Sequence, residues 1–387
     1  MAHVDDWLTR KGEWLREFRR DVHAHPELSW QERRTTELVF EALTAAGLHP
    51  RRLSTTGLVC DLGPSEGPRI ALRADMDALP IHEDTGLPFA STSAGVSHAC
   101  GHDLHTSILL GTGLALATVP ELPIGVRLVF QPAEEVMPGG ALSAVRDGVL
   151  DGVSKIFALH CDPRIEVGKV GVRSGPITSA ADHLEVVLHS AGGHTSRPHL
   201  TSDLIYGLGT VIVGLPGVLS RRIDPRSGTV MVWGAANGGS APNAIPQIGR
   251  LNGTVRTGEH HVWEILEPLV REAVDGMLGP LRLKYEVNYT RGVPPVINDE
   301  AATATIAAAA RAFDPEGVTD TPQSGGGEDF SWYLEDVPGA MARLGVWPGE
   351  GPQHDIHQPD FIADERALET GVRILYGIVF ESGSELG

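Results

Sequence analysis

The stretch SHACGHDLHT, residues 97–106, concentrates side chains that bind metal ions. It holds three histidines, a cysteine and an aspartate in a chain that has three cysteines altogether. Thiolate, imidazole and carboxylate groups are all good zinc ligands. Cys100 and His102 are separated by one glycine, so both could reach a metal from the same turn. The stretch predicts one corner of a metal site, with Asp103 and His105 supporting the ligands.

Polar side chains also follow several predicted strands, at the point where each strand ends. These segments are RADMD (73–77) after a strand at 69–74, QPAEE (131–135) after 125–131, LH (159–160) closing 155–160, and HDIHQPDF (354–361) after 339–346. Loops at the carboxyl edge of an open α/β sheet converge, so we expect these segments to meet. Glu135, His160 and His357 would then join Cys100 and His102. Five ligands exceed the four of a closed structural site, and two metals sharing a ligand and a water would use them better.

Each of these residues, taken alone, has a structural explanation. His160 at a strand end could be a hydrogen-bonded structural residue, and Cys100 could be a small buried hydrophobe. Glu134 and Glu135 could form a solvated acidic face. Their joint placement at successive strand ends is what favours a metal site.

The elements that must position these residues alternate between strands and helices. Two helices open the chain, one over 4–22 and a second that begins after a capping box of Ser29 and Glu32 and ends near Gly47. The strands above then alternate with helices near 103–118, 139–149, 300–312 and 364–380. This order predicts an α/β fold with a mixed, largely parallel sheet and flanking helices.

A different pattern between about 180 and 290 predicts a second domain. Strand 182–190, helix 202–220, strands 228–235 and 248–256, helix 259–278 and strand 281–290 give the β-α-β-β-α-β order of a ferredoxin-like α+β domain. Gly- and Pro-rich junctions flank it at 169–179 and 290–299. We predict an inserted domain at 179–291 that divides the catalytic, metal-binding domain into 1–178 and 292–387.

Composition narrows the class of partner. The 387-residue chain has a formal net charge of −19, which repels phosphate backbones and anionic membrane surfaces, so we expect neither nucleic acid nor a membrane as partner. Charged residues interrupt the first 20 positions, so no signal-peptide core is expected, and no later run is expected to span a bilayer. These features predict a cytoplasmic protein. Three sparse cysteines argue against a disulfide scaffold.

A family resemblance joins these segments. The chain contains, in order, HACGHDLHTSILLG, QPAEE, ALH, AGGHTSRPH, APNAIP, GTVR, GGEDFSWY and HQPDFIADE. Together they resemble the hippurate hydrolase and indole-acetyl-amino-acid hydrolase branch of the zinc aminoacylase/carboxypeptidase metallopeptidase family, over nearly the whole chain. The resemblance implies a catalytic domain with an inserted lid and dimerisation domain. It also implies cleavage of the amide bond of N-acyl-amino acids, or of related carboxylate-bearing amides or dipeptides.

The resemblance also assigns roles within the predicted metal site. It implies two divalent metals per chain, zinc first with manganese, cobalt or nickel as alternatives, and Cys100 lying between them. The implied ligands are Cys100, His102, Glu135, His160 and His357. Glu134 becomes the general base, which takes a proton from the attacking water and passes it to the leaving nitrogen. Asp77 and Asp103 are expected to orient the ligand imidazoles.

Within the inserted domain, the resemblance implies groups that act on the substrate. The histidine matching His194 reaches an active site in relatives, often that of the partner subunit, and stabilises the oxyanion. Asn243 and Arg256 resemble groups that grip the free carboxylate of the substrate, and His199 joins the substrate-binding set. A homodimer through the inserted domain follows from the same resemblance. Glu328 and Asp329, beside a glycine run, are expected to line the pocket.

One departure and two alternatives remain open. Relatives commonly follow the LH ligand with apolar or aromatic residues, whereas this chain has Cys161 and Asp162, which could change the acyl pocket or the metal preference. In a different mechanism, Cys100 would be a nucleophile activated by a neighbouring histidine. In a third class, the chain would be a metal-binding homologue without catalytic turnover.

Overall fold

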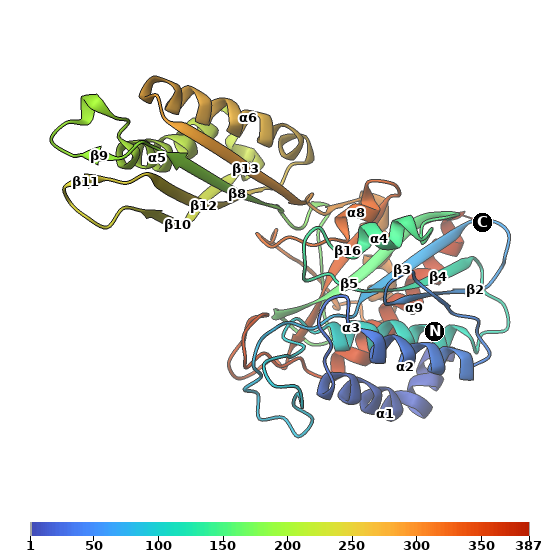
Figure 1. Ribbon diagram of the computed structural model, residues 1–387. Helices are drawn as coiled ribbons and strands as arrows, with labels where there is room; N and C mark the ends of the chain where they lie inside the picture. The colour runs from blue at the N-terminus through green and yellow to red at the C-terminus, as the bar shows by residue number, and fades with distance from the viewer. Residues whose placement is uncertain (1, 387) are drawn as a thin grey trace. The chain divides into compact units, whose positions relative to one another are not determined.

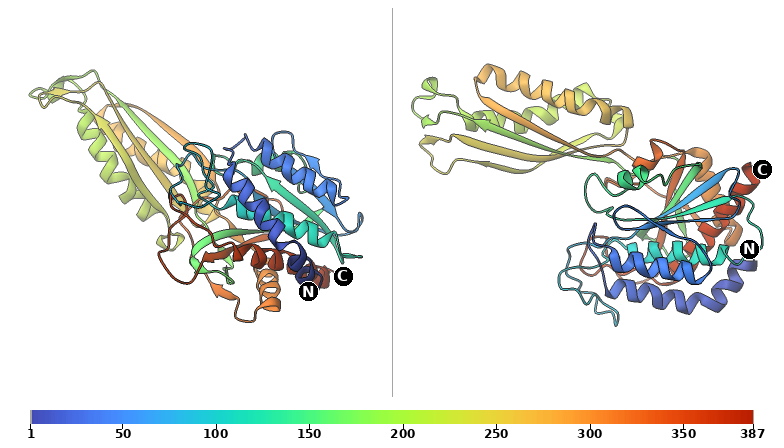
Figure 2. Two further views of the ribbon diagram at one scale, coloured as in Figure 1. Left: turned by 90° about the horizontal axis from the view of Figure 1, so that it is seen from below. Right: turned by 45° about the vertical axis from the view of Figure 1, so that its right-hand side comes forward.

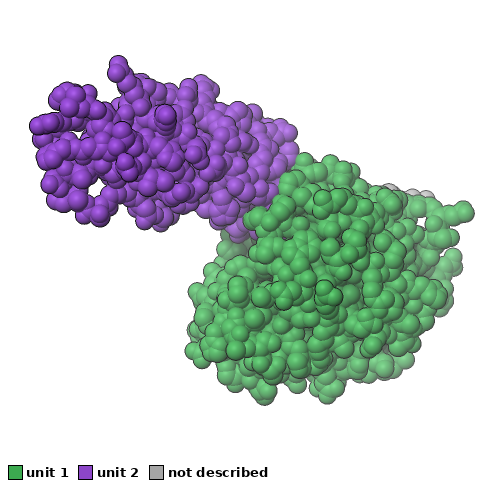
Figure 3. Space-filling view, viewed as in Figure 1, with its two compact units in different colours: residues 1–177, 297–322, 329–387 green, residues 178–296, 323–328 purple. Residues whose placement is uncertain are grey.

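The computed structural model describes residues 2–386 and divides the chain into two compact units (Figure 3). Unit 1 runs up to Ile177 and includes Ile297–Pro322 and the chain from Asp329 on. Unit 2 is Thr178–Val296 with a second short segment, Gln323–Glu328. This second segment lies outside the predicted range 179–291 of the inserted domain. It belongs with unit 2 because Gln323 Nε2 donates to the Thr178 carbonyl at 3.0 Å and the Gly326 carbonyl accepts from the Ser179 amide at 3.1 Å.

Unit 1 is built on an eight-stranded sheet, and the predicted α/β class with a largely parallel sheet is confirmed. Its strands in spatial order are β1 (Arg51–Arg52), β2 (Leu58–Leu62), β4 (Gly125–Gln131), β3 (Arg69–Asp75), β5 (Val153–Glu166), β16 (Gly339–Trp347), β6 (Val170–Val172) and β15 (Val318–Asp320). The four central strands β4, β3, β5 and β16 run parallel. All seven residues of β4 are buried, as expected for a strand covered on both faces.

Helices cover both faces of this sheet, and α3 and α4 lie on opposite sides of the central strands (Figure 1). The helices of unit 1 are α1 (Ala2–Ala24), α2 (Arg33–Ala45), α3 (His102–Leu116), α4 (Ala141–Arg146), α7 (Glu300–Phe313), α8 (Ser331–Leu334) and α9 (Arg366–Leu386). Helix α3 is buried along nearly its whole length, with α1 and α9 packed against it. A minor pair, β7 (Gly175–Pro176) with β14 (Ile297–Asn298), completes the unit.

The predicted capping box at the start of the second helix is wrong. Glu32 occupies the N-cap position of α2 but makes no side-chain cap bond. The carboxylate of Glu27 instead accepts the amides of Arg34 and Thr35, at 2.9 and 2.8 Å. A glutamate upstream of the helix thus satisfies the free amides, which leaves Ser29 and Glu32 for other contacts.

Unit 2 has the predicted ferredoxin-like order of elements. These are β8 (Ala180–His189), α5 (Leu204–Arg222), β10 (Val230–Gly238), β12 (Ile248–Thr257), α6 (His260–Leu278) and β13 (Lys284–Val293). The sheet order is β10-β12-β8-β13 with antiparallel neighbours, and α5 and α6 pack on it with their own core (Figures 1 and 2). Two short strands, β9 (Gly193–His194) and β11 (Ala244–Ile245), pair with each other beyond the end of this sheet.

Helix α5 corrects one expectation from the sequence. Contrary to that expectation, its 19 residues are long and apolar enough to cross a bilayer by length and composition. One face, with Leu204, Leu208, Val211 and Leu215, is buried in the core of unit 2, as in the core helix of a globular domain. Only 33% of the apolar stretch of this helix is buried. The helix therefore also has apolar surface that the rest of the chain does not cover.

Candidate metal centre

The cysteine-histidine stretch turns sharply into helix α3. The helix begins at His102, and Gly101 before it has a φ of 83°, the left-handed region that glycine enters freely. A Cβ at this position would lie 2.7 Å from the Cys161 sulfur. Glycine is therefore required here, and the turn that it allows places Cys100 and His102 on the same side.

The five predicted ligands come together at the carboxyl edge of the central strands. The ligand atoms of Cys100, His102 and His160 all lie within 4.8 Å of one another, and so do those of Cys100, Glu135 and His357. Within these groups, Cys100 Sγ is 3.5 Å from His160 Nε2, and His357 Nε2 is 3.3 Å from Glu135 Oε1. Cys100 belongs to both groups, which is the arrangement expected of a ligand between two metals.

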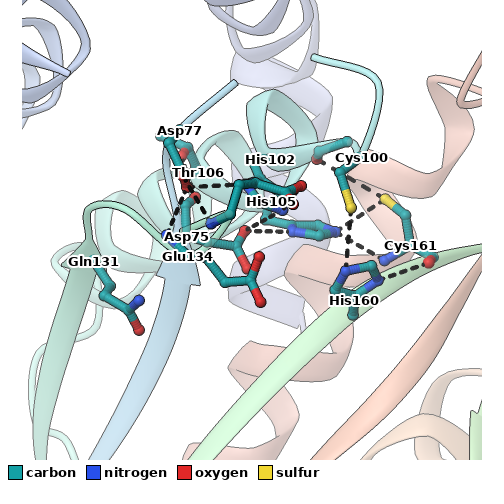
Figure 4. Close-up of polar contacts among 12 residues, drawn as sticks. Asp75, Asp77, Cys100, His102, His105, Thr106, Gln131, Glu134, His160 and Cys161 are labelled. Atoms are coloured by element: carbon teal, nitrogen blue, oxygen red, sulfur yellow. Dashed lines mark hydrogen bonds and ion pairs between the residues drawn. The ribbon is translucent and has the colours of Figure 1, made fainter. Parts of the chain in front are cut away.

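The two buried imidazoles, His160 and His102, each leave a ring nitrogen free for a metal ion. His160 Nδ1 donates to the Cys161 carbonyl at 2.8 Å, so its Nε2 lone pair faces Cys100 (Figure 4). His102 Nδ1 lies 3.3 Å from Asp77 Oδ1, and neither of its two buried ring nitrogens has a hydrogen-bond partner among the described residues. Buried polar atoms normally have partners, so an orphaned ring nitrogen among other ligands fits a cation site.

The electrostatics of the cluster also favour a cation. Burial lowers the pKa of His102, but the carboxylates of Asp75, Asp77 and Glu135 outweigh burial and raise it to about 10. Burial raises the pKa of the Cys100 thiol well above its usual range, and Glu135 and Glu134 raise it further. The thiolate is the reactive form of cysteine both as a nucleophile and as a metal ligand, so either role of Cys100 requires a nearby positive charge. A divalent cation bound by the neighbouring ligands would supply that charge.

Asp77 is tied to more of the site than its predicted role required. Besides His102, it accepts the backbone amides of Glu134 and Glu135, each at 3.0 Å, and the hydroxyl of Ser29 at 2.6 Å. One buried carboxylate thus orients a predicted ligand and also fixes the loop that carries both glutamates. The side chains of Cys100, His102, Glu134 and His160 gather from separate elements (Figure 4). Ligand atoms of His102, Glu134 and Glu135 lie within 4.8 Å of one another.

Asp103 and His105 have partners other than the expected ones. Asp103 accepts from Arg19 Nε at 2.7 Å and from His23 Nδ1 at 2.9 Å, rather than from a predicted ligand. His105 Nδ1 lies 2.6 Å from Asp75 Oδ1, and its Nε2 accepts the Cys161 amide at 2.8 Å. Both ring nitrogens of His105 are therefore occupied by protein groups, and the residue supports the strand that carries His160.

Cys161 and Asp162, the two residues that depart from the family pattern, both contact other groups of the protein. Cys161 Sγ lies 3.0 Å from His105 Nε2 and packs against Gly101. Asp162 is buried and accepts from Arg164 through two bonds, at 2.9 and 2.6 Å. The acidic group beside His160 is thus paired with a guanidinium.

A buried network that the sequence did not reveal holds the start of the QPAEE loop, residues 131–135. Arg73 donates to Asp75 at 2.6 Å, to Gln131 at 2.8 Å and to Asp329 at 2.9 Å. Asp329 also accepts the amide of Ala141, the first residue of α4, at 2.9 Å. Asp329 thus has a bracing role beyond the predicted pocket lining. In the sequence, the charged triplet RAD (73–75) at the end of an apolar strand was the feature that could have revealed this network. Glu328, in unit 2, is buried.

Of the substrate-binding residues predicted in unit 2, His194, His199 and Asn243 are exposed and Arg256 is half-buried, and they fall into two places. His194 on β9 pairs with Ala244 beside Asn243, and the neighbouring His199 is exposed too. Arg256, whose guanidinium donates to the Gly325 carbonyl, lies eight residues along β12 from its first residue, roughly 26 Å away. Asn243 directly precedes β11, which comes before β12 in the chain. Figure 1 shows β11 beyond one end of the four-stranded sheet. Asn243 and Arg256 of one chain are therefore too far apart to hold one carboxylate together, so their predicted shared role would need groups from two chains.

Comparisons with known proteins place the chain in a family. Residues 71–381 match the model of peptidase family M20/M25/M40. The chain is 55% identical over 368 residues to a Rhodococcus jostii (strain RHA1) protein named as a candidate glutamate–cysteine ligase 2-3. That match covers 94% of this chain and 46% of the relative, so the chain spans about half of its length. The chain is also 40% identical over 361 residues to N-acetyl-L-cysteine deacetylase of Bacillus subtilis (strain 168), covering 92% of this chain and 85% of the relative.

A solved structure shows the same fold. The Bacillus subtilis YXEP protein, described as a dinuclear metal binding peptidase from the M20 family, matches with a TM-score of 0.84 at 33% identity. The match covers 98% of this chain and 99% of that one. The resemblance drawn from the sequence is confirmed for the family, while the hippurate hydrolase branch is not singled out. The chain belongs to peptidase family M20/M25/M40 and is a hydrolase of that family.

Proposed function

We propose that the chain is a binuclear metal-dependent amidohydrolase that releases an acid and an amino acid from N-acyl-amino acids. The observation that carries this proposal is the pair of ligand groups that share Cys100, with Glu134 beside them. Cys100, His102 and His160 would hold one divalent cation, and Cys100, Glu135 and His357 the other. The mixed donor set of thiolate, imidazoles and carboxylate suits zinc, with manganese, cobalt or nickel as alternatives.

When bound, the two cations would supply Lewis acidity that lowers the pKa of the attacking water and polarises the substrate carbonyl. The general base for that water is Glu134, whose carboxylate lies beside the ligand groups and whose amide is fixed by Asp77. Glu134 accepts the proton of the water during attack and then delivers it to the leaving nitrogen. Its neighbour Glu135 acts as a ligand, so adjacent carboxylates have different tasks.

The relatives suggest a substrate class within the N-acyl-amino acids. One relative is named as an N-acetyl-L-cysteine deacetylase, and another is named for joining glutamate to cysteine while being about twice as long as this chain. A hydrolase that frees cysteine would supply the amino acid that such a ligase consumes. We therefore propose N-acylated cysteine as the first substrate to examine, ahead of dipeptides and other carboxylate-bearing amides.

We further propose that the active unit is a homodimer formed through unit 2. Two features support it: α5 exposes Tyr206 and Val213, and the edge strand β10 exposes Val230 and Val232. Val213 is 78% exposed, and Tyr206, seven residues before it on the same helix, is 63% exposed. A dimer would also let His194 and Asn243 of one chain and Arg256 of the other act on one substrate, with His194 stabilising the oxyanion.

The test is hydrolysis of a panel of N-acyl-amino acids, including N-acetylcysteine, before and after chelation and after thiol alkylation of the metal-loaded enzyme. We expect amide cleavage that chelation abolishes and added metal restores. Cleavage that survives chelation but is lost on alkylation would support Cys100 as a nucleophile instead. A protein that binds metal without cleaving any member of the panel would support the non-catalytic alternative.

A further inference from the structure

The segment between α1 and α2 contacts the loop that carries the predicted base. Leu28 forms a parallel bridge with Ala78, and the Ala78 amide donates to the Glu27 carbonyl at 2.8 Å. This places residues 28–32 alongside the end of strand β3 and the QPAEE loop. Ser29 then reaches Asp77, whose carboxylate holds the amides of Glu134 and Glu135.

Glu32 reaches the same loop directly. Its carboxylate is completely buried, and its Oε1 accepts the Ala133 amide at 2.8 Å. The same oxygen accepts the Trp30 amide at 3.0 Å, and Oε2 accepts the Thr56 hydroxyl at 2.6 Å. Two carboxylates, those of Glu32 and Asp77, thus hold the three consecutive amides of residues 133–135.

The backbone at both ends of the Glu32 contact is in an unusual conformation. Four non-glycine residues in the described chain have a positive φ, and two of them are Trp30 at 67° and Ala133 at 55°. Both donate their amides to the same oxygen of Glu32. Left-handed backbone at non-glycine residues persists where surrounding contacts hold it, and such residues cluster at functional sites.

A purely structural role explains Glu32 poorly. Burial raises its pKa to about 7, so ionisation of this carboxyl opposes folding at neutral pH. The residue makes no cap bond to α2, which Glu27 caps instead. What the buried carboxylate does provide is a fixed position for Ala133, the residue immediately before Glu134.

We propose that Glu32 is a positioning residue for the reaction, which holds Ala133 in its left-handed conformation and thereby aims the Glu134 carboxylate at the ligand groups. Ser29 contributes from the other side through Asp77. The proposal rests on the proposed function in so far as Glu134 is the general base. Without Glu32, Ala133 would relax toward a commoner conformation, and the peptide that follows it would rotate the Glu134 side chain away.

The experiment compares Glu32→Leu, which cannot accept a hydrogen bond, with Glu32→Gln, whose amide oxygen can still accept from Ala133. Glu27→Gln is the matched control, because Glu27 lies in the same segment and binds two helix amides but not the loop. Steady-state kinetics on the metal-loaded enzymes are paired with hydrogen exchange of the 133–135 amides in the metal-free proteins. Metal content and the melting temperature are measured for each variant.

We expect Glu32→Leu to lower kcat by about 10- to 100-fold with KM and metal content close to wild type. The same variant should accelerate exchange of the three amides by about tenfold or more, since an opened loop exposes them. Glu32→Gln should retain most of the activity and protection. Glu27→Gln should lower the melting temperature while leaving kcat and the exchange of these amides unchanged.

Unchanged kcat and exchange in Glu32→Leu would overturn the proposal, and so would equal losses in Glu27→Gln.

If Glu32→Leu fails to fold, Ser29→Ala becomes the deciding variant. It removes one hydroxyl contact and should lower kcat by about two- to fivefold and accelerate exchange of the Glu134 and Glu135 amides. Unchanged kcat and unchanged exchange of these amides in Ser29→Ala would then overturn the proposal. If the proposed function fails, wild type shows no metal-dependent hydrolysis, whereas the exchange measurement still reports whether Glu32 holds the loop.

Discussion

The two groups of predicted functional residues, one in unit 1 and one in unit 2, are held in opposite ways. In unit 1, Cys100, His102 and His160 are buried, Glu135 is half-buried and His357 is exposed, and buried groups such as Asp77, which accepts the Glu134 amide, hold the segments that carry them. In unit 2, His194 is exposed, and its Nδ1 accepts from the amide and hydroxyl of Ser196, two residues away. The first group is organised by the fold of one unit, whereas the second has only local support.

This difference indicates which part of the chemistry each unit can perform alone. A preorganised buried site can bind cations and place a base without any further conformational change. An exposed histidine with only local contacts can act only when something brings a substrate to it, such as a second subunit or closure of a domain. Variants of the two groups should therefore differ in their effects on stability, metal content and complementation.

The largest effect is expected for Glu134→Gln. Removing the general base should lower kcat by about 10²- to 10⁴-fold. Because glutamine preserves the shape of the side chain and the Asp77 bond is to the backbone amide, the free energy of unfolding should change by less than about 0.5 kcal/mol. Kinetics, elemental analysis and thermal unfolding of the same preparation check this. A variant with near-wild-type kcat would remove Glu134 from the mechanism.

His194→Ala should have the next largest effect, a loss of about 10²- to 10³-fold in kcat, typical of one missing oxyanion donor. Since the residue is exposed, metal content and melting temperature should stay at wild-type values. Unfolding and refolding a mixture of His194→Ala and Glu134→Gln tests whether the histidine acts across a dimer. Recovery of up to about one quarter of wild-type activity is expected if it does, because half of the dimers then carry one complete site.

No recovery in that mixture, from proteins that are shown to exchange subunits, would place His194 in the active site of its own chain. It would also require another explanation for the separation of Asn243 and Arg256 along unit 2.

The smallest effect is expected for a substitution of His23, whose Nδ1 binds Asp103 in the first turn of α3. Burial lowers the pKa of His23, but the charge of Asp103 and hydrogen bonds to Asp103 and Glu83 outweigh it and raise the pKa to about 9. A raised histidine pKa stabilises the fold fully below the unfolded pKa of 6.5 and loses that contribution as the pH rises through 9.

His23→Gln should therefore cost more stability at pH 6 than at pH 9.5, by about 2–3 kcal/mol in the free energy of unfolding of the metal-free protein. Chemical denaturation at the two pH values measures the difference. An equal loss at both would show that His23 contributes packing rather than charge.

The sequence predicted what depends on local order and spacing. The strands that carry the ligands, the turn at Gly101 and the β-α-β-β-α-β order of unit 2 all follow from patterns within short windows, and the structure has each of them. The segment 323–328 was missed because its contacts with unit 2 join residues far apart in the chain.

The residues that hold the predicted ligands in place were predicted less well, because their contacts also join residues far apart in the chain. Ser29 and Glu32 fit a capping box by spacing, yet the Ser29 hydroxyl binds a residue 48 positions away and the Glu32 carboxylate binds one 101 positions away. Asp103 stands next to a predicted ligand in sequence, but the helix turns it toward Arg19. Spacing identifies which residues can act as ligands, while the partners that orient them depend on tertiary packing.

The measurement that tests the account most directly is the number of metal ions per chain, by elemental analysis of wild type and of Cys100→Ala and His160→Ala after reconstitution and removal of excess metal. Cys100 belongs to both ligand groups and His160 to one. We predict about two ions in wild type, about one in His160→Ala, and fewer than one in Cys100→Ala. A wild-type protein that retains one ion or none, or a Cys100→Ala variant that retains two, would contradict a two-metal centre organised around Cys100.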